Sequence, residues 1–327
     1  MACITEIGND NEIDKLLNRV FTSPIRTGYV EVGEDKFCLP VYYQKYEESL
    51  KSFDIFEDDV FICGHPKTGT TWCSEMIWLI VNNLNYEGAL SKEIYKRVSQ
   101  LELCSLFNIS EKPGADNYNK YAGLQYIAEA ARPRCIKTHL HWSLLPDQIQ
   151  NGTKKPKMVV VLRNSEDSCV SLYHHSQMVE KYTGTFEEFC TLFLAGRVCF
   201  GPFWKQVLSY WEQKYRPNLL FVKYKEMKED LPAVIKKVST FLGKTYTEEE
   251  IEKLSKHLSF ESMKKNPAVN HEEVFNKLKE VGYTTSDSCF IRSGKVGAFK
   301  LKMSPDMIKK FEAWTKENLN GTGLSVE

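Results

Sequence analysis

The chain of 327 residues is organised around the stretch Val60-Phe61-Ile62-Cys63-Gly64-His65-Pro66-Lys67-Thr68-Gly69-Thr70-Thr71-Trp72. The apolar run at its start is typical of a buried strand. A loop with Gly64 and Gly69 at its two ends follows, and beyond Thr71 apolar residues recur at helical spacing. A strand, a glycine loop and a helix N-terminus form a cradle for an anion, because the first N–H groups of a helix have no partner within it. We therefore expect a phosphate group in this loop.

The loop differs at one position from the phosphate loop of nucleoside triphosphatases, G-x-x-x-x-G-K-[ST]. Gly64, Gly69 and Thr71 fit that pattern, but Thr70 stands where the lysine should be, and the lysine lies inside the loop at position 67. This arrangement suits a 5′-phosphate better than a magnesium-bound triphosphate. A P-loop nucleotide kinase or other NTPase is the first alternative, and saturation by ATP and magnesium would support it.

The composition narrows the class of protein. Lys plus Arg and Asp plus Glu both number 43, so the formal net charge is zero, which argues against a nucleic-acid partner. The apolar runs are too short to span a membrane, and the ten cysteines form no CxxC pair. We expect a cytoplasmic protein with reduced thiols, no membrane contact and no metal site. We expect a single domain over residues 1–327, with its core at about 40–300.

The pattern of strands and helices predicts an α/β fold with a P-loop-type parallel sheet flanked by helices on both faces. A polar turn within 28–43 indicates a hairpin before the sheet. We expect loops with short helices over 85–133, long loops over 264–300, and a helix from Pro305 to Asn318. The predicted strands are Val60–Cys63, Arg134–Thr138, Met158–Leu162 and Leu219–Tyr224, and the clearest predicted helices are Phe186–Phe193 and Phe203–Tyr215.

Ligands of such sheets bind beyond the carboxyl ends of the strands, and reactive side chains follow two of the predicted strand ends. Lys137 and His139 lie two residues apart at the end of one strand, so they point the same way. An imidazole there suits a general base, because its pKa lies near neutrality. His141 is the alternative base. The next strand ends at Arg163, a buried position that is costly for a cation unless an anion meets it.

Three separated motifs resemble the cytosolic sulfotransferase family, whose members use 3′-phosphoadenosine-5′-phosphosulfate (PAPS) as donor. They are Pro66–Trp72, Lys137-Thr138-His139-Leu140 and Phe290–Lys300. The resemblance implies sulfuryl transfer from PAPS to a hydroxyl of a small phenol or alcohol, leaving 3′,5′-bisphosphoadenosine, with His139, Lys67 and Lys137 as catalytic residues. It also implies that the nucleotide is bound by Lys67, Thr68, Gly69, Thr70, Thr71, Trp72, Arg163, Ser171, Trp204, Ser259, Phe260, Arg292, Ser293 and Gly294.

The sequence departs from the family pattern on the acceptor side and in the C-terminal segment Phe290–Lys300. His141 replaces the usual proline after the catalytic strand end, and Ser293, Ala298 and Phe299 replace the usual lysine, aspartate and tryptophan. The acceptor therefore stays open among phenols, steroid-like alcohols and small aromatic hydroxyls. A non-catalytic nucleotide-binding protein and an elimination enzyme that converts a sulfonated alcohol into an alkene are further alternatives.

The family's dimer segment, K-x-x-x-T-V-x-x-x-E, is altered here. Ser304 and Pro305 replace its threonine and valine, and Lys309 replaces its glutamate. Serine followed by proline is typical of a helix start rather than of an extended strip. We expect a monomer, or a dimer formed by another surface.

Overall fold

The computed structural model describes residues 3–108, 120–280 and 289–326. Its central sheet has five parallel strands in the order β5-β6-β4-β7-β8. The α/β class, the parallel sheet and the flanking helices predicted above are confirmed. The strands are β4 (Val60–Cys63), β5 (Val98–Gln100), β6 (Cys135–Thr138), β7 (Lys157–Leu162) and β8 (Leu219–Lys223).

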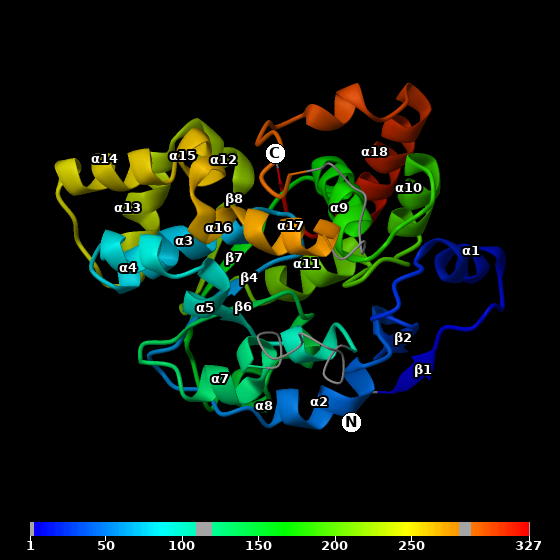
Figure 1. Cartoon of the computed structure of the whole chain (residues 1–327), viewed down its shortest axis with the longest axis horizontal. Coiled ribbons are helices and arrows are strands. Elements are labelled where there is room, and N and C mark those ends of the chain that lie inside the picture. Colours follow the sequence, from blue (N-terminus) through cyan, green and yellow to red (C-terminus); the bar gives the residue numbers. More distant parts are fainter. Residues whose placement is uncertain (1–2, 109–119, 281–288, 327) are drawn as a thin grey trace.

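Alternate residues of the strands enter two separate hydrophobic clusters, because successive side chains of a strand point to opposite faces. On β7, Val159 and Val161 join one cluster with α3 and α13, whereas Met158, Val160 and Leu162 join the other with α9, α10 and α18. Both faces of the sheet are thus covered by helices (Figure 1). These helices are α3 (Thr70–Val81), α9 (Ser165–Val179), α10 (Phe186–Leu194), α11 (Phe203–Trp211), α13 (Leu231–Phe241), α14 (Glu248–His257) and α18 (Pro305–Leu319).

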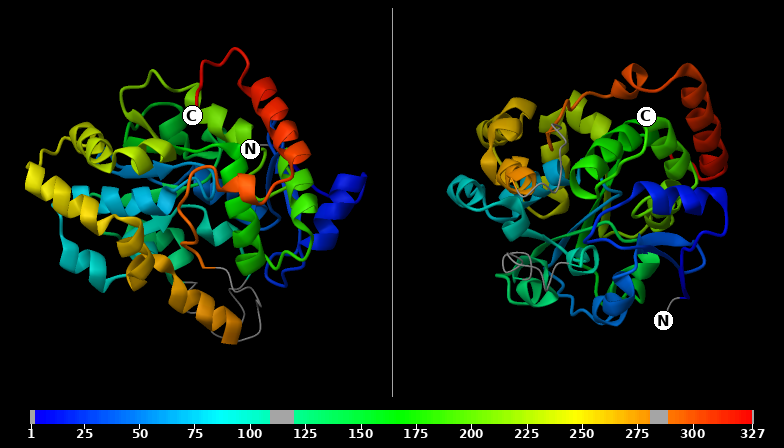
Figure 2. Two further views of the ribbon diagram at one scale, coloured as in Figure 1. Left: turned by 90° about the horizontal axis from the view of Figure 1, so that it is seen from above. Right: turned by 45° about the vertical axis from the view of Figure 1, so that its right-hand side comes forward.

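A smaller antiparallel sheet, β1-β2-β3, precedes the main one. The expected hairpin within 28–43 is its second and third strands, β2 (Tyr29–Val32) and β3 (Phe37–Pro40), and β1 (Ile4–Glu6) pairs with β2. Helix α14 and helix α18 lie at opposite ends of the molecule in Figures 1 and 2. The remaining helices are α1 (Glu12–Val20), α2 (Tyr43–Lys51), α4 (Tyr86–Ser91), α5 (Ile94–Arg97), α7 (Leu124–Ala128), α8 (Asp147–Gln150), α12 (Tyr224–Glu229), α15 (Phe260–Lys265), α16 (Pro267–Asn270) and α17 (Glu272–Glu280), with 3₁₀ turns η1 (Leu103–Ser105), η2 (Trp142–Leu144) and η3 (Ala298–Leu301).

The four predicted strands agree with the structure to within one residue at each end, and α18 confirms the predicted C-terminal helix. The expectation of long loops over 264–300 is wrong for α16 and α17, which are helical, while 281–288 lie outside the described residues. Within 85–133 the short helices are present, but the edge strand β5 was not predicted, and 109–119 are not described. All ten cysteines are free thiols, as expected. Among the described residues, no helix is both long and apolar enough to cross a bilayer.

Candidate active site

The loop between β4 and α3 has the geometry of an anion cradle. Gly69 precedes the first residue of α3 with a φ of 106°, and it has no side chain to cap the helix. A Cβ atom on Gly69 would lie 2.7 Å from the ring of Tyr224, and one on Gly64 would lie 2.7 Å from the carbonyl oxygen of Val161. Glycine is therefore required at both ends of the loop, and the amino end of α3 is left open to a ligand.

A cavity of about 780 Å³ lies beyond the carboxyl ends of β4, β6 and β7. It is lined by residues from these strand ends, from α9 and from the C-terminal segment, which are far apart in the sequence. The structure thus brings most of the predicted site residues together around one space. Those that line it are Lys67, Gly69, Thr70, Thr71, Trp72, Lys137, His139, Arg163, Ser171, Phe260, Arg292, Ser293 and Gly294.

Three predicted nucleotide-binding residues are not among the residues that line this cavity. Thr68 is buried and donates its hydroxyl hydrogen bond to the carbonyl of His65 at 2.8 Å. Ser259 accepts a hydrogen bond from the backbone of Ser262 and begins α15. Trp204 is 1% exposed and packs against aromatic rings of the core. The side chains of these three residues therefore do not face into the cavity.

Two lysines meet in the cavity. Burial, together with neighbouring Lys137, Arg163 and Arg292, lowers the pKa of Lys67 to about 7. Burial lowers the pKa of Lys137 to about 8, although Glu102 opposes the shift. A group of desolvated cations is unfavourable unless an anion joins it, so the site is arranged for a multiply charged anionic ligand.

Arg163 links the phosphate loop to the C-terminal segment. Its Nη1 donates to the carbonyl oxygen of Lys67 at 3.0 Å, its guanidinium lies 4.3 Å from the ring centre of Tyr224, and its Nε has no hydrogen-bond partner among the described residues. Asp167, which lies 3.8 Å from Arg163, accepts the backbone N–H groups of Gly297 and Phe299 at 2.8 and 3.1 Å. Asp167 therefore holds the segment that carries Arg292 and Gly294 against the amino end of α9.

The imidazole of His139 has a defined tautomer. Its Nδ1 lies 2.5 Å from the carbonyl oxygen of Gly64, and because a carbonyl can only accept, Nδ1 carries the proton. Burial and the nearby Lys137 lower the pKa of His139 well below its usual value, so the ring is neutral. The remaining nitrogen, Nε2, then has a free lone pair. A buried neutral imidazole with Nε2 unprotonated, lining a cavity beside two lysines, is chemically a proton acceptor.

Comparison with known proteins agrees with this geometry. The model of the sulfotransferase domain family matches residues 57–323. The chain belongs to the sulfotransferase family. It is 38% identical over 329 residues to luciferin sulfotransferase of Photinus pyralis, covering 99% of this chain and 88% of the relative, and 34% identical to sulfotransferase 1B1 of Mus musculus, covering 85% and 88%. Among solved structures, retinol dehydratase with androsterone and the inactive cofactor PAP superposes with a TM-score of 0.87 at 29% sequence identity, covering 98% of both chains. Retinol dehydratase with retinol and PAP superposes with a TM-score of 0.88 at 28% sequence identity, covering 99% of this chain and 98% of that one. The protein is a sulfotransferase.

In this sulfotransferase, a buried carboxylate that sequence analysis missed positions the strand end that carries Lys137 and His139. Glu102 accepts the backbone N–H of His139 and the hydroxyl of Thr138, both at 2.9 Å, and the side-chain amide of Gln100 at 2.7 Å. Burial raises the pKa of Glu102, and these hydrogen bonds oppose the rise. Glu102 follows the unpredicted edge strand β5. Glu102 could have been found from the sequence only if β5 had been recognised as a strand.

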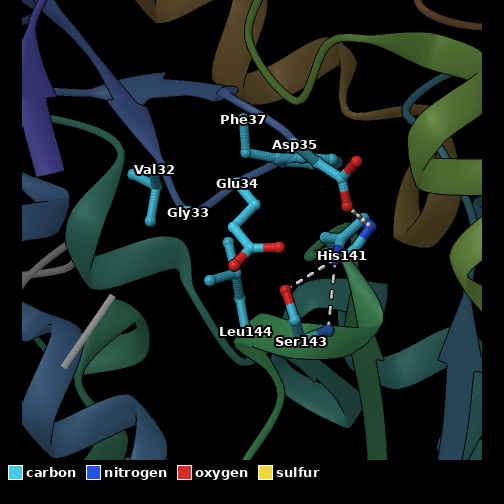
Figure 3. A pocket seen from close by; sticks show the side chains of 8 residues that line it. All are labelled: Val32, Gly33, Glu34, Asp35, Phe37, His141, Ser143 and Leu144. Carbon is cyan, nitrogen blue, oxygen red and sulfur yellow. Dashed lines mark hydrogen bonds and ion pairs between the residues drawn. The ribbon is translucent and has the colours of Figure 1, made fainter. Parts of the chain in front are cut away.

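His141, the alternative base, faces a different space. Figure 3 shows its ring turned toward Asp35 of the β2–β3 hairpin, in a smaller pocket of about 220 Å³. Its Nε2 lies 3.3 Å from Asp35, and its Nδ1 lies 2.8 Å from the hydroxyl of Ser143 and accepts the backbone N–H of Ser143 at 3.2 Å. Both nitrogens of His141 are engaged there. His139, rather than His141, therefore lies with the lysines of the sulfotransferase cavity.

Aromatic side chains gather at the end of the cavity that is lined by Trp72 and Phe260. The indole of Trp72 donates to the carbonyl of Leu258 at 2.8 Å and makes an edge contact with Tyr224 at 5.7 Å. The ammonium of Lys228 lies 5.7 Å from the ring centres of both Trp72 and Phe260. Gly294 packs so close to Phe260 that a Cβ atom on it would lie 2.4 Å from the ring. These rings offer flat surfaces for a base.

Sequence analysis also assigned no role to several other side chains that line the cavity. Phe290 lies over the ammonium of Lys67, with 3.8 Å from Nζ to the ring centre, and its ring also contacts His175 and His271. Arg26 and Glu180 form a buried ion pair in the cavity wall. Phe290 opens the Phe290–Lys300 motif, but no sequence pattern distinguishes Arg26, Glu180, His175 or His271 from ordinary core or surface residues.

Proposed function

We propose that this sulfotransferase takes its sulfuryl group from PAPS and transfers it to the hydroxyl of a small organic acceptor, with His139 as the general base. The observation that carries the proposal is the arrangement of His139: its Nδ1 is committed to the carbonyl of Gly64, and its ring lines a cavity that also contains Lys67 and Lys137. Only Nε2 is then available to take the proton of the attacking hydroxyl.

The two lysines balance the charge that moves during transfer. The acceptor oxygen forms a bond to sulfur while the bond from sulfur to the 5′-phosphate oxygen breaks, so negative charge grows on the departing phosphate. Lys67 lies in the loop that cradles this phosphate, and Lys137 is suited to the equatorial sulfuryl oxygens. Thr70, Thr71 and the amino end of α3 hold the phosphate itself.

The 3′-phosphate and the adenine of the donor are assigned to the other side of the cavity. Arg163, Ser171, Arg292, Ser293 and Gly294 line it there, and the unpartnered Nε of Arg163 supports an anion at this place. Trp72 and Phe260, at the nucleotide end, are placed to take the adenine between them. The retinol dehydratase structures with PAP support the assignment, because that protein shares this fold over nearly the whole chain.

We further propose a cytoplasmic location, one domain over residues 1–327, and a monomer or a dimer that does not use the family's dimer segment. The ten free thiols support the location. Helix α18 begins at Pro305 with Ser304 as its N-cap, which supports the altered assembly.

Incubation with radiolabelled PAPS and a panel of phenols and alcohols tests the function. Transfer of label to at least one hydroxyl acceptor, with release of 3′,5′-bisphosphoadenosine, is the expected result. Saturable binding of ATP with magnesium, without binding of a 3′-phosphoadenosine nucleotide, would support the NTPase alternative instead.

A further inference from the structure

One wall of the cavity is helix α9, whose lining residues run from the nucleotide end to the acceptor end. Ser171, Leu172, His175 and Val179 recur at helical spacing, and Glu180 follows directly after the helix. With a rise of about 1.5 Å per residue, His175 lies about 6 Å and Glu180 about 14 Å along the axis from Ser171. His175 therefore lies between the nucleotide end of the cavity and the far wall at its acceptor end.

The far wall is closed by a buried ion pair. Arg26 Nη1 lies 2.5 Å from Glu180, Arg26 Nε donates to the carbonyl of Leu106 at 3.1 Å, and Tyr29 donates to Glu180 at 3.3 Å. The guanidinium of Arg26 also lies 4.5 Å from the ring centre of Phe107. The opposite charges of Arg26 and Glu180 offset each other, although Arg26 Nη1 makes no hydrogen bond among the described residues. Polar recognition at this end of the cavity therefore also depends on the other side chains that line it.

His175 has unused hydrogen-bonding capacity. The ring is part exposed and lines the cavity, but its Nδ1 is shielded from solvent and has no hydrogen-bond partner among the described residues. Burial and the nearby Lys67, Lys137 and Arg26 hold its pKa well below the usual value, so the ring is neutral. Buried N–H groups without a partner are rarer in proteins than buried acceptors without one, so we place the single proton on Nε2. The donor N–H then lies on the edge of the ring away from the shielded Nδ1.

We propose that His175 is a specificity-determining residue, whose Nε2–H donates a hydrogen bond to a second oxygen of the acceptor, separate from the reacting hydroxyl. The preferred acceptor is thus a phenol or alcohol that also carries an ether or carbonyl oxygen. A hydrocarbon alcohol of the same shape leaves this N–H without a partner and binds more weakly. The inference deepens the proposed function and rests on it for the identity of the reacting hydroxyl.

The test uses acceptor binding, which does not require turnover. The full-length protein is saturated with 3′,5′-bisphosphoadenosine, and titration calorimetry then measures the affinity for 2-naphthol and for its methoxy and acetyl derivatives substituted at successive ring positions. We expect the wild type to bind at least one oxygenated derivative about fivefold to tenfold more tightly than 2-naphthol, the size of one hydrogen bond. His175→Phe should abolish that preference while binding 2-naphthol about as well.

Two further variants separate recognition from packing. His175→Gln keeps an N–H donor and should restore part of the preference. His174→Phe, on the neighbouring residue that does not line the cavity, should leave it unchanged. An equal preference in wild type and His175→Phe, or no preference in the wild type, would overturn the assignment of His175. Absence of sulfuryl transfer by a wild type that shows the preference would count against the proposed function alone.

Discussion

At the scale of single residues, the site depends on hydrogen bonds that fix the tautomer and the position of His139. The carbonyl of Gly64 orients His139, and the carboxylate of Glu102 fixes the backbone from which His139 projects. A general base held in one tautomer does not have to reorganise when the acceptor hydroxyl arrives.

Replacement of His139 by alanine should lower turnover by about 10²-fold or more, because no other group is placed to take the proton. Affinity for 3′,5′-bisphosphoadenosine should hardly change. Steady-state kinetics with labelled donor and calorimetry with the nucleotide measure the two effects. Near-normal turnover in this variant would make the assignment wrong, and the matched variant His141→Ala would then be examined as the base.

Arg163 and Arg292 should distinguish nucleotides by the 3′-phosphate. A hydrogen bond to a charged group contributes roughly 1.5–3 kcal/mol, so either arginine-to-alanine change should weaken 3′,5′-bisphosphoadenosine by about tenfold to a hundredfold. Binding of 5′-AMP should change much less. If both nucleotides lose affinity equally, the arginines hold another part of the ligand.

At the scale of elements, the strands that carry the site were visible in the sequence and their supports were not. β4 is a continuous apolar run, and β7 is one after Lys157, as strands buried on both faces must be. β6 has only two apolar residues, Cys135 and Ile136, and it was recognised together with Lys137 and His139 at its end. The edge strand β5 has only three residues and is defined by its pairing with β6. The position of Glu102 beside the sheet could therefore not be predicted from the sequence. Trp204 is the opposite case, since it was predicted to contact the nucleotide but lies in the core. An aromatic residue in the core has the same local sequence pattern as one beside a ligand.

The proposed state of assembly rests on a short segment. Ser304 accepts the backbone N–H of Met307 at 3.2 Å and begins α18, and Ala298–Leu301 form a 3₁₀ turn, so the segment that would pair between subunits is not extended. We expect a monomer by light scattering, or a dimer that is insensitive to this segment. A dimer that dissociates when residues 304–308 are substituted would contradict the prediction.

At the scale of the whole molecule, we expect the half-buried lysines of the cavity to couple nucleotide binding to pH. The pKa values of Lys67 and Lys137 are lowered from 10.5 to about 7 and about 8, so the unfolded chain takes up these protons more readily than the folded one. The contribution of these lysines to the stability of the nucleotide-free protein therefore falls as pH decreases from about 10.5 toward 7. A bound phosphate raises both pKa values again, so binding takes up protons at alkaline pH.

Affinity for 3′,5′-bisphosphoadenosine should accordingly decrease as pH rises from about 7.5 to 9, by up to about tenfold per pH unit for each lysine that must be protonated. Calorimetry in two buffers of different ionisation enthalpy measures the proton uptake directly. Lys67→Met should lower the uptake and the slope, whereas Lys205→Met, near the surface beside Asp35, should leave both unchanged. A pH-independent affinity would show that the lysines are already protonated in the free protein.

The crowding of cations also governs how the catalytic cycle ends. The spent nucleotide keeps both of its phosphates, so it retains the partners of Arg163, Arg292, Lys67 and Lys137, and its departure leaves these positive groups facing one another in a half-buried space. If these residues hold the two phosphates as proposed, we expect release of the nucleotide to be the slowest step of each turnover. Rapid mixing of enzyme, donor and acceptor should show a burst of sulfonated product close to one equivalent per active site, followed by a slower steady rate that salt accelerates.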